Sequence, residues 1–583
     1  MNRNYIGLAN SYHDGALAVV NSKGEVVFAE ATERYLQCKR AINMSPDLYV
    51  RTIDVIRDYC DLRAELVPAY SWSSGMQRLV NEQLLTFDTL KQTMIGEFGA
   101  APEEIYRQMT GPVFSLFAQA QQLAHPGLVL NFELSQGDGR KYHSGIARHY
   151  DHHLTHASTG CLTSPFDEAV CAIVDGYGEG RACDCYVYKD GKLTQLDSVP
   201  SGNDSSLGFF YANICALCGF DPMIGEEWKV MGLASYGEMD HDIYDLLKAL
   251  IRADGVNIVS ATGYTAQKIW YKLGHYRRKD DEPSIAAANL AYAAQRVFTE
   301  ILLEYLNNLY GKGISDNLVL GGGCALNSSA NGQILDSTPF KKLHVFSAPG
   351  DDGNAIGAAL LAYQEDHPDF RPPQHQLMPY LGSSMSLETL SNVRKFSGIP
   401  KLSECKDDAP ERAAAMLSNG KIIGWIQGRA EYGPRALGNR SILADPRSSD
   451  IKDTINSRVK FREEFRPFAP SILHEFGPQF FEHYQESPYM ERTLKFRKEV
   501  MDLVPGVVHH DGTGRLQTVK KEWNERYYRL IYQFWKLTKV PLVLNTSFNV
   551  MGKPISHSVE DVLAVFYTSG LDAVFIDNVL IEK

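Results

Sequence analysis

The sequence lacks a long apolar segment and a surplus of positive charge. Among its 583 residues no apolar run approaches the roughly 20 residues that a membrane-spanning helix needs. Residues 1–8 do not contain the apolar core of a secretory signal peptide. The formal net charge of −12 disfavours a protein that holds nucleic acid through phosphate contacts. We therefore expect a cytoplasmic protein with neither a nucleic acid nor a membrane as its partner.

The chain also lacks paired cysteines at the spacing of a zinc site. Its ten cysteines are scattered, and Cys183 and Cys185 have no second pair to complete a ligand set. Several other cysteines stand at apolar positions, which favours free thiols in a reducing compartment. The composition, 44% hydrophobic and 22% charged, is ordinary for a globular chain of two or three domains.

One short segment, His152-His153-Leu154-Thr155-His156, carries histidines four residues apart. On a helix these lie on one face and can share a divalent cation. The apolar run Ala169–Val174 predicts a buried strand that ends at Asp175, and a carboxylate with two imidazoles suits iron, manganese or zinc. Without Asp175, a hydrogen-bonded helix start would explain the histidines equally well. The His-Glu-x-x-His pattern is absent from this segment, which disfavours a metalloprotease.

Two parts of the chain resemble each other. Residues 5–32 and 169–196 each read as a strand, a polar glycine-containing turn and a hairpin. This duplication predicts two related α/β halves, as in the architecture of actin-like ATPases and sugar kinases.

Further glycine-rich turns suit a phosphate or a ribose. A strand at 317–320 leads into Gly321-Gly322-Gly323, where the backbone can approach an anion closely. About thirty residues later, Asp351-Asp352-Gly353 enters a helix of small residues, which can pack tightly on a neighbour. Together these turns indicate a nucleotide site in the N-terminal part of the chain.

Beyond a boundary at 367–376, arginines stand among glycine, proline and phenylalanine. They occur in several separate segments of an acidic protein. Because arginine binds phosphates and carboxylates through two parallel hydrogen bonds, we interpret this region as the binding site of a small, highly anionic substrate. The alternative is a structural network of arginines. The segments are 428–441, 460–469, 510–517 and 544–549.

In their order along the chain, four motifs resemble the carbamoyltransferases of natural-product biosynthesis, a family that includes the tobramycin, cephamycin and nodulation-factor enzymes. The resemblance covers nearly the whole chain, and the set is far more specific than any single motif. The motifs are Tyr12-His13-Asp14-Gly15, Gly225-Glu-Glu227-Trp-Lys-Val-Met-Gly-Leu233, Gly433-Pro-Arg-Ala-Leu-Gly438 and Asn545-Thr-Ser-Phe-Asn549.

The resemblance implies an α/β protein of two domains. Residues 1–375 would form a duplicated actin-like (ASKHA) domain similar to TsaD, and residues 376–583 an α+β domain similar to YrdC. The C-terminal domain would convert carbamoyl phosphate and ATP to carbamoyl-adenylate. The N-terminal domain would then pass the carbamoyl group to a hydroxyl of a small-molecule natural product.

The resemblance also implies a role for several groups of residues. His13 would be the base for the acceptor hydroxyl, with Lys39 and Glu227 nearby. A metal, iron before manganese or zinc, would be held by His152, His156, Asp175 and one of Asp351 and Asp352, of which Asp351 fits the spacing better. Mg-ATP, the co-substrate, would contact Gly321, Gly322 and Asn327. Carbamoyl phosphate and the adenylate would be bound by Arg435, Lys460, Arg466, Arg515, Asn545 and Ser547.

Other functions explain less of the sequence. Threonylcarbamoyl transfer to tRNA, as by TsaD, predicts a basic face, and a sugar kinase leaves the histidine pair and the C-terminal cations without a role. Carbamoyl transfer to a cysteine would require a Cys-x-x-Cys array. A stretch at 78–145 reads as amphipathic helices, which we interpret as a core insert rather than a lid or a dimer surface. Homodimerisation is a hypothesis that the sequence leaves open.

Overall fold

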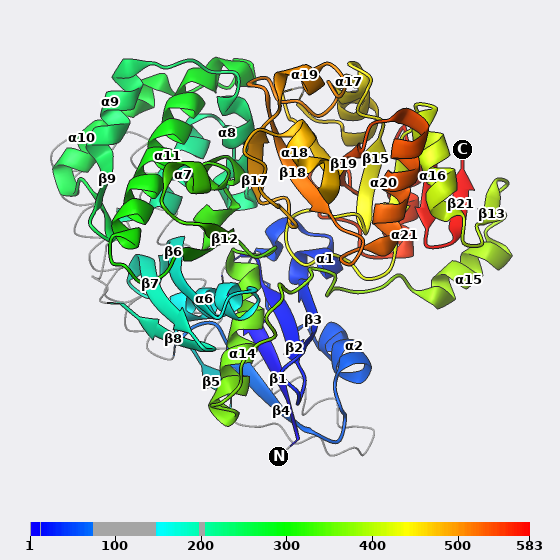
Figure 1. The fold of residues 1–583 in the computed structure, drawn as a ribbon, viewed down its shortest axis with the longest axis horizontal. Helices are drawn as coiled ribbons and strands as arrows, with labels where there is room; N and C mark the ends of the chain where they lie inside the picture. The colour runs from blue at the N-terminus through cyan, green and yellow to red at the C-terminus, as the bar shows by residue number, and fades with distance from the viewer. Residues whose placement is uncertain (1, 12, 43, 74–146, 197–204, 464) are drawn as a thin grey trace. The chain divides into compact units, whose positions relative to one another are not determined.

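The computed structural model describes residues 2–11, 13–42, 44–73, 147–196, 205–463 and 465–583 (Figure 1). The predicted helical stretch at 78–145 therefore lies outside the described residues. The chain forms two compact units. The first unit contains Met1–Thr32, Arg40–Asn327 and Ile334–Leu377, and the second contains Glu33–Lys39, Ser328–Gln333 and Met378–Lys583. Within the described ranges, no helix has the length and apolar content that a membrane span requires.

The first unit is built on two five-stranded sheets with the same strand order and pairing. In each, three consecutive strands pair antiparallel, and two later strands add parallel to the first of them. One sheet, ordered β3-β2-β1-β4-β5, consists of β1 (Arg3–Ala9), β2 (Ala16–Val20), β3 (Val26–Ala31), β4 (Glu65–Tyr70) and β5 (Arg148–His149). The other, ordered β12-β11-β6-β7-β8, consists of β6 (Glu168–Gly178), β7 (Arg181–Lys189), β8 (Lys192–Gln195), β11 (Asn317–Gly321) and β12 (Lys342–His344).

The two segments that resemble each other in sequence form the first three strands of these two sheets. The hairpin turns contain Gly24 and Gly191 with φ of +82° and +81°, the left-handed conformation that glycine adopts without strain. The predicted strands and their glycine turns are therefore confirmed. The chain has a mixed α/β fold.

Alternating side chains of β1 face two different helices. Ile6 and Leu8 pack in a cluster with Val55 of α2 (Tyr49–Tyr59). On the opposite face, Gly7 lies against α14 (Asn354–Asp366), and a Cβ atom at Gly7 would stand 1.8 Å from the Ala355 carbonyl oxygen. The absence of a side chain at this point lets the helix lie directly on the sheet.

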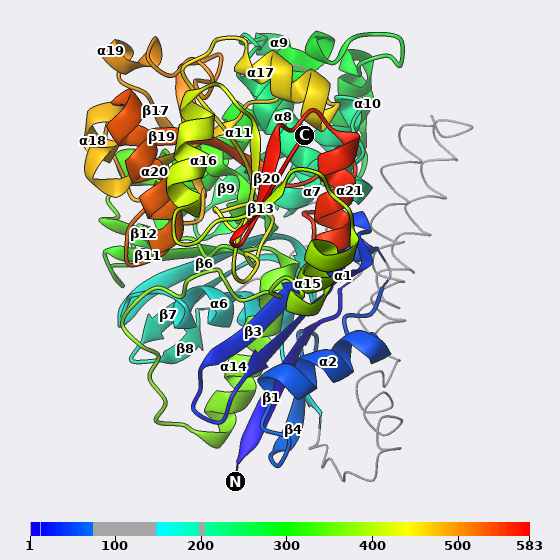
Figure 2. The same ribbon diagram turned by 90° about the vertical axis from the view of Figure 1, so that its right-hand side faces the viewer.

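The helix α14 also packs closely on α6 (His152–Leu162), as Figures 1 and 2 show. At the contact, a Cβ atom on Gly357 would lie 2.0 Å from the Thr155 carbonyl oxygen. The expectation that this small-residue helix packs tightly on a neighbour is confirmed. Its N-terminal turn, Asp351–Gly353, is thereby held beside the histidines of α6.

The long helix α11 (Ala288–Tyr310) packs its buried face on three of the remaining helices of the first unit, namely α7 (Leu207–Leu217), α8 (Glu227–Ala234) and α9 (His241–Leu250). A hairpin of β9 (Ile251–Asp254) and β10 (Asn257–Ser260) lies beside it. The helix α10 (Gly263–Leu273) packs on α9, and α13 (Ile334–Ser337) packs beside β12.

The second unit is built on a mixed nine-stranded sheet ordered β13-β21-β20-β14-β15-β19-β16-β18-β17. The strands are β13 (Leu402–Glu404), β14 (Ile423–Ile426), β15 (Arg440–Ala444), β16 (Ala469–Leu473), β17 (Arg492–Lys495), β18 (Thr513–Val519), β19 (Leu542–Ser547), β20 (Ala573–Ile576) and β21 (Val579–Glu582). Its helices are α15 (Leu387–Phe396), α16 (Ala409–Ser418), α17 (Ile451–Ile455), α18 (Gly477–Phe480), α19 (Lys498–Met501), α20 (Glu525–Thr538) and α21 (Val559–Thr568).

Two short pieces from earlier in the chain belong to the second unit. The piece 33–39, which contains most of α1 (Thr32–Leu36), is tied to it by a hydrogen bond of 2.6 Å from Arg34 Nη2 to the Gly433 carbonyl. The piece 328–333, with α12 (Ser328–Asn331), donates from Asn331 Nδ2 to the Glu491 carbonyl at 3.0 Å.

Candidate functional site

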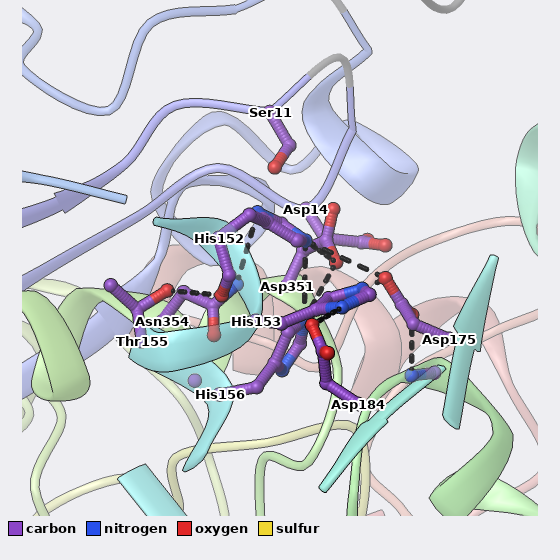
Figure 3. A network of polar contacts seen from close by, with 12 residues as sticks. Ser11, Asp14, His152, His153, Thr155, His156, Asp175, Asp184, Asp351 and Asn354 are labelled. Carbon is purple, nitrogen blue, oxygen red and sulfur yellow. Dashed lines mark hydrogen bonds and ion pairs between the residues drawn. The ribbon is translucent and has the colours of Figure 1, made fainter. Parts of the chain in front are cut away.

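Four side chains of the first unit converge from three separate elements (Figure 3). The helix α6 supplies His152 and His156, one turn apart, β6 supplies Asp175, and the turn before α14 supplies Asp351. One ligand atom of each lies within 4.8 Å of all the others. The sequence predicted this group, and the structure brings it together.

The distances in this group fit a small divalent cation. His152 Nε2 lies 3.3 Å from His156 Nε2, and each of these atoms is 3.5 Å from Asp351 Oδ1. Asp175 Oδ2 is 3.5 Å from His152 Nε2 and 3.8 Å from His156 Nε2. Four ligands placed about 2.1 Å from an ion in a tetrahedron stand about 3.4 Å from one another. The observed distances are close to this value.

The electrostatics of the group also suit a cation. Burial lowers the pKa of His152, but the carboxylates of Asp351 and Asp175 outweigh it and raise this pKa to about 10. Burial also lowers the pKa of His156, and here the carboxylates do not reverse the shift. The pKa of Asp351 is held well below its ordinary value by His152 against the effect of burial. A positive charge between these carboxylates is therefore favoured, and a divalent ion bound there would take the place of the imidazole proton.

Asp352 does not join the group. Its Oδ1 accepts a hydrogen bond of 3.1 Å from the Gly353 N–H, whereas Asp351 faces the histidines. Of the two neighbouring acids that the sequence left open, the structure thus places Asp351 with the histidines.

Aromatic and acidic side chains hold α6 in place. The Trp72 ring, fully buried, stacks on the His152 ring with centroids 4.0 Å apart. Glu179 accepts a hydrogen bond of 3.1 Å from the His152 N–H at the helix start. His153 is not one of the four, and its Nδ1 lies 2.8 Å from Asp184 Oδ2 (Figure 3). These supports fix the helix that carries the two predicted metal ligands.

The carboxylate of Asp175 connects the histidine group to the glycine turn after β11. Its Oδ1 accepts a hydrogen bond of 2.7 Å from the Gly323 N–H, while its Oδ2 faces the histidines. Gly322 has φ of +87°, and a Cβ atom there would lie 2.3 Å from the Val174 carbonyl oxygen. Gly321 packs against β6 in the same way, with a Cβ position 2.9 Å from a methyl group of Ile173.

Asn327, the third predicted nucleotide contact, pairs with a neighbouring amide. Its Nδ2 donates to Gln295 Oε1 at 3.0 Å, and its Oδ1 accepts from Gln295 Nε2 at 3.1 Å. Gln295 in turn accepts a hydrogen bond of 2.6 Å from the Tyr211 hydroxyl. This network places Asn327 at the end of the glycine turn in the first unit.

His13 lies beside the cation group, with Nδ1 3.9 Å from Asp351 Oδ2 and 2.9 Å from Asp14 Oδ2. Burial raises the pKa of Glu227 above its ordinary value, although the charges of Arg40 and His13 lower it. Both residues therefore belong to one electrostatic environment. Lys39 belongs to the second unit, and its place beside them stays a prediction.

In the second unit, Lys460 stands at the end of a π-helical turn, Asn456–Lys460. Such turns occur often at functional sites. The lysine is 2% exposed, and its Nζ donates to Asn549 Oδ1 at 2.6 Å and to Ser547 Oγ at 3.3 Å. Burial, together with the charges of nearby Arg462, Lys39 and Arg466, lowers the pKa of Lys460 well below its ordinary value.

Three guanidinium groups form a cluster that adjoins this lysine through Arg462. Burial lowers the pKa of Arg515, and the charges of Arg435 and Arg462 lower it further. Within the described part of the chain, neither Arg435 nor Arg515 forms an ion pair or a hydrogen bond through its side chain. Arg462 donates to Asn456 at 2.8 Å and lies over the Phe468 ring. Because guanidinium groups stay charged at neutral pH, this group favours a multiply charged anion.

Other predicted residues of this region have protein partners. Arg466 pairs with Glu463 at 2.5 Å. Asn545 is buried, and its Nδ2 donates to the Ala436 carbonyl, to Ser471 and to Gln517. Arg440, which stood within the first arginine-containing segment, is fully buried and donates to four backbone carbonyls. The alternative of a structural network therefore holds for Arg440, while Arg435, Arg462 and Arg515 stand apart from it.

The sequence reasoning missed one residue that organises the Arg435 loop. Glu431 is buried, and its Oε1 accepts hydrogen bonds from the N–H groups of Leu437, Asn439 and Arg440 at 2.7, 2.7 and 3.1 Å. Glu431 stands four positions before Arg435, a spacing that indicates an ion pair at most. The sequence pattern therefore did not predict that Glu431 accepts hydrogen bonds from three backbone N–H groups. Arg462 lies within the predicted anion-binding segment 460–469 but was not singled out as a site residue.

Comparison with known proteins adds independent findings. The family model described as the carbamoyltransferase N-terminus matches residues 106–360, and the one described as the carbamoyltransferase C-terminus matches residues 414–583. The uncharacterized protein sll1178 of Synechocystis sp. is 31% identical over 99% of this chain and 96% of its own length. Nodulation protein NolNO of Sinorhizobium fredii is 35% identical over 78% of this chain and 67% of its own length. A solved structure of full-length HypF, in its phosphate- and nucleotide-bound form, covers 62% of this chain and 55% of that chain with 9% identity and a TM-score of 0.35.

Proposed function

The chain belongs to the carbamoyltransferase family, and from this premise we propose that it is an ATP-dependent O-carbamoyltransferase that acts on a hydroxyl of a small molecule. That the protein is an enzyme and a carbamoyltransferase follows from the family. In the proposed scheme, carbamoyl phosphate, ATP and water give carbamoyl-adenylate, phosphate and pyrophosphate. The acceptor oxygen then bonds to the carbamoyl carbon, the bond from that carbon to the phosphate oxygen breaks, and AMP leaves.

The observation that carries the proposal is the set of cations in the second unit. Burial lowers the pKa of Arg515, the charges of Arg435 and Arg462 lower it further, and the buried Lys460 feels the charge of Arg462. Carbamoyl phosphate and ATP together bring several negative charges that repel each other. Fixed guanidinium groups relieve this repulsion and stabilise charge that develops in the transition state. We assign adenylate formation to this set and, with it, to residues 376–583 as a YrdC-like domain.

The first unit supplies the proposed transfer site. Its two sheets of equal strand order support a duplicated actin-like domain, and the turn Gly321–Gly323 suits a nucleotide phosphate, with Asn327 at its end. His13 is the proposed base. Removal of the acceptor proton by such a group is typically worth ~10²–10⁴ in rate. Glu227, whose pKa is raised by burial, lies in the same environment and is a second candidate to hold a proton.

A metal ion fits the four-residue group of the first unit, because the nitrogen and oxygen atoms have the required spacing and charge. His152, His156, Asp175 and Asp351 would hold it, and two imidazoles with two carboxylates suit iron before manganese or zinc. When bound, such an ion supplies positive charge for a phosphate or carbamoyl oxygen. Trp72 and Glu179 keep the histidines oriented for it.

The alternative of threonylcarbamoyl transfer to tRNA is not favoured. Both halves of the carbamoyltransferase family match, at residues 106–360 and 414–583, and a curated relative at 35% identity is a nodulation protein. The net charge of −12 also opposes a nucleic-acid substrate. A small hydroxylated acceptor remains the proposal.

The half-reaction of the second unit can be measured without knowledge of the acceptor. We expect pyrophosphate release from ATP to depend on carbamoyl phosphate and to fall by at least about 100-fold in Lys460→Ala, given the loss of a buried cation from the anion site. Lys495→Ala, which removes an exposed lysine of the same unit, is the matched control. Pyrophosphate release that ignores carbamoyl phosphate, or that survives in Lys460→Ala, would contradict the proposal.

A further inference from the structure

Lys460 and Arg466, which the sequence assigned to the anion site, already have protein partners. Lys460 Nζ donates to Asn549 Oδ1 at 2.6 Å, to the Asn549 carbonyl at 3.0 Å and to the Ser547 carbonyl. An ammonium group has three protons to donate, so these contacts engage all of them. Arg466 pairs with Glu463 at 2.5 Å. Both cations therefore stabilise the protein around the anion site.

Arg462, which lies between these two cations in the sequence, differs from both. Within the described ranges, its Nη2 is buried and has no hydrogen-bond partner. Its Nε donates to Asn456 Oδ1 at 2.8 Å, which leaves the N–H groups of the terminal nitrogens for another acceptor. A buried donor of a charged group costs free energy when it has no partner, so this atom calls for a ligand.

The Arg462 side chain is held in one orientation. Its backbone N–H donates to the Asn456 carbonyl at 3.2 Å, so Asn456 binds this residue through both main chain and side chain. Its Cζ lies 4.6 Å from the centroid of the Phe468 ring, within the range of a cation–π contact. Phe461, which precedes it, is a non-glycine residue with φ of +52°, and such strained backbone clusters at functional sites. These contacts fix the guanidinium before a ligand binds, which lowers the entropic cost of binding.

The charge of Arg462 acts on cations on both sides of it. It lowers the pKa of Lys460 and also the pKa of Arg515. Burial, together with the charge of Arg466, lowers the pKa of Arg462 itself to about 9, against the effect of Glu463. An anion placed among such cations stabilises their charged forms. The charges around Arg462 therefore favour an anion beside it.

From this geometry we propose that the terminal nitrogens of Arg462 bind a phosphate group in the second unit, while Lys460 and Arg466 stabilise the protein around it. The inference rests on the proposed function, in which this cation set receives carbamoyl phosphate and ATP. A guanidinium can donate two parallel hydrogen bonds to a phosphate, which an ammonium cannot. Because several like charges surround Arg462, the ligand class is a phosphate anion with more than one negative charge.

The test uses inorganic pyrophosphate, because its binding requires neither the acceptor nor carbamoyl transfer. Isothermal titration calorimetry measures its dissociation constant for the full-length wild type, Arg462→Gln and Arg462→Lys. We expect the dissociation constant to rise by about 10–100-fold in Arg462→Gln, as for the loss of a hydrogen bond between charged groups. Arg462→Lys should recover part of that loss. Arg412→Gln, which removes a side chain of α16 that is 43% exposed, is the matched control.

The dependence of binding on salt separates a phosphate contact from a structural role. The pyrophosphate affinity of Arg462→Gln should depend less on salt concentration than that of the wild type, because salt screens one ionic contact fewer. Arg462→Lys, which keeps the charge, should retain the wild-type dependence. The midpoint of denaturant unfolding without pyrophosphate checks that each variant is folded. Unchanged affinity or unchanged salt dependence in Arg462→Gln would overturn the inference. Where Arg462→Gln does not fold, Arg462→Lys decides, because it should bind pyrophosphate more weakly than the wild type, and equal affinity would contradict the contact.

The outcomes distinguish this inference from the scheme on which it rests. Arg515→Ala identifies the site, because it should remove most of the pyrophosphate binding by the cation set that contains Arg462. Pyrophosphate binding that Arg515→Ala leaves unchanged, or no binding by the wild type, would refute the inference. If Arg462→Gln weakens pyrophosphate binding while pyrophosphate release from ATP ignores carbamoyl phosphate, the scheme fails and the contact stands. If release depends on carbamoyl phosphate and Arg462→Gln binds pyrophosphate as tightly as the wild type, the contact fails and the scheme stands.

Discussion

Replacing Gly357 with alanine tests how closely α14 must pack on α6 for the histidine group to exist. The new Cβ atom would stand 2.0 Å from the Thr155 carbonyl oxygen and 2.6 Å from Thr159 Oγ1. Real Cβ atoms do not come within about 3.0 Å of such an oxygen, so the two helices must separate by about 1 Å or more. The same helices carry His152, His156 and, in the turn before α14, Asp351.

A separation of about 1 Å is large for a metal site, because ligand distances tolerate only about 0.2 Å. We therefore expect the metal affinity of Gly357→Ala to fall by at least ~10–100-fold, the range seen when the supports of a metal site are lost. Overpacking should also cost about 1–3 kcal/mol of folding free energy. Metal content after dialysis against a metal buffer measures the first effect, and denaturant unfolding of the metal-free protein measures the second.

Gly311→Ala is the matched control. Gly311 follows the end of α11, away from the histidine group, with φ of −59° and a nearest neighbour at 3.2 Å from the added Cβ. It should change neither metal content nor stability by a comparable amount. If Gly357→Ala bound metal as tightly as the wild type, the reasoning that places Asp351 in the site through helix packing would be refuted.

Three further predictions address other parts of the account. Binding of a paramagnetic ion such as Mn²⁺ should quench the fluorescence of Trp72, whose ring stacks on His152. Total tryptophan emission should fall by up to about one sixth if the six tryptophans emit equally, and Trp72→Phe should abolish the change. Glu431→Ala leaves three N–H groups without their acceptor and should lower the free energy of unfolding by about 2–4 kcal/mol, with a more mobile Arg435 loop. An unchanged midpoint of denaturant unfolding would contradict the organising role of Glu431. Burial and nearby cations lower the pKa of His509 to about 4. Between about pH 6.5 and 4 only the unfolded chain takes up this proton, so the free energy of unfolding should decrease as the pH falls through this range. His509→Asn should reduce the dependence of the unfolding free energy on pH.

Local patterns were sufficient to predict the elements that carry the first site. Four-residue spacing placed His152 and His156 on one helix face, and an apolar run ending in a carboxylate placed Asp175 at a strand end. The strands of the two similar segments followed from alternation and glycine turns. These features depend on neighbours within a few residues, which the sequence displays directly.

The parts that the sequence did not predict depend on contacts between distant residues. The sequence favoured Asp351 but left Asp352 open, and the packing of α14 on α6, about two hundred residues away, places Asp351 with the histidines. Lys39 belongs to the second unit because of tertiary packing that its neighbours in sequence do not reveal. Arg440 and Arg515 look alike as arginines in polar segments, yet one binds backbone carbonyls and the other stands among like charges.

The central claim is that carbamoyl phosphate and ATP combine into carbamoyl-adenylate before any transfer. The most direct test is to quench a reaction of the full-length enzyme with both substrates and no acceptor, and to identify the nucleotide products by mass spectrometry. The account predicts a species with the mass of AMP plus a carbamoyl group, formed only with both substrates and absent in Arg515→Ala. Formation of ADP, or carbamoyl transfer with ATP left intact, would contradict it.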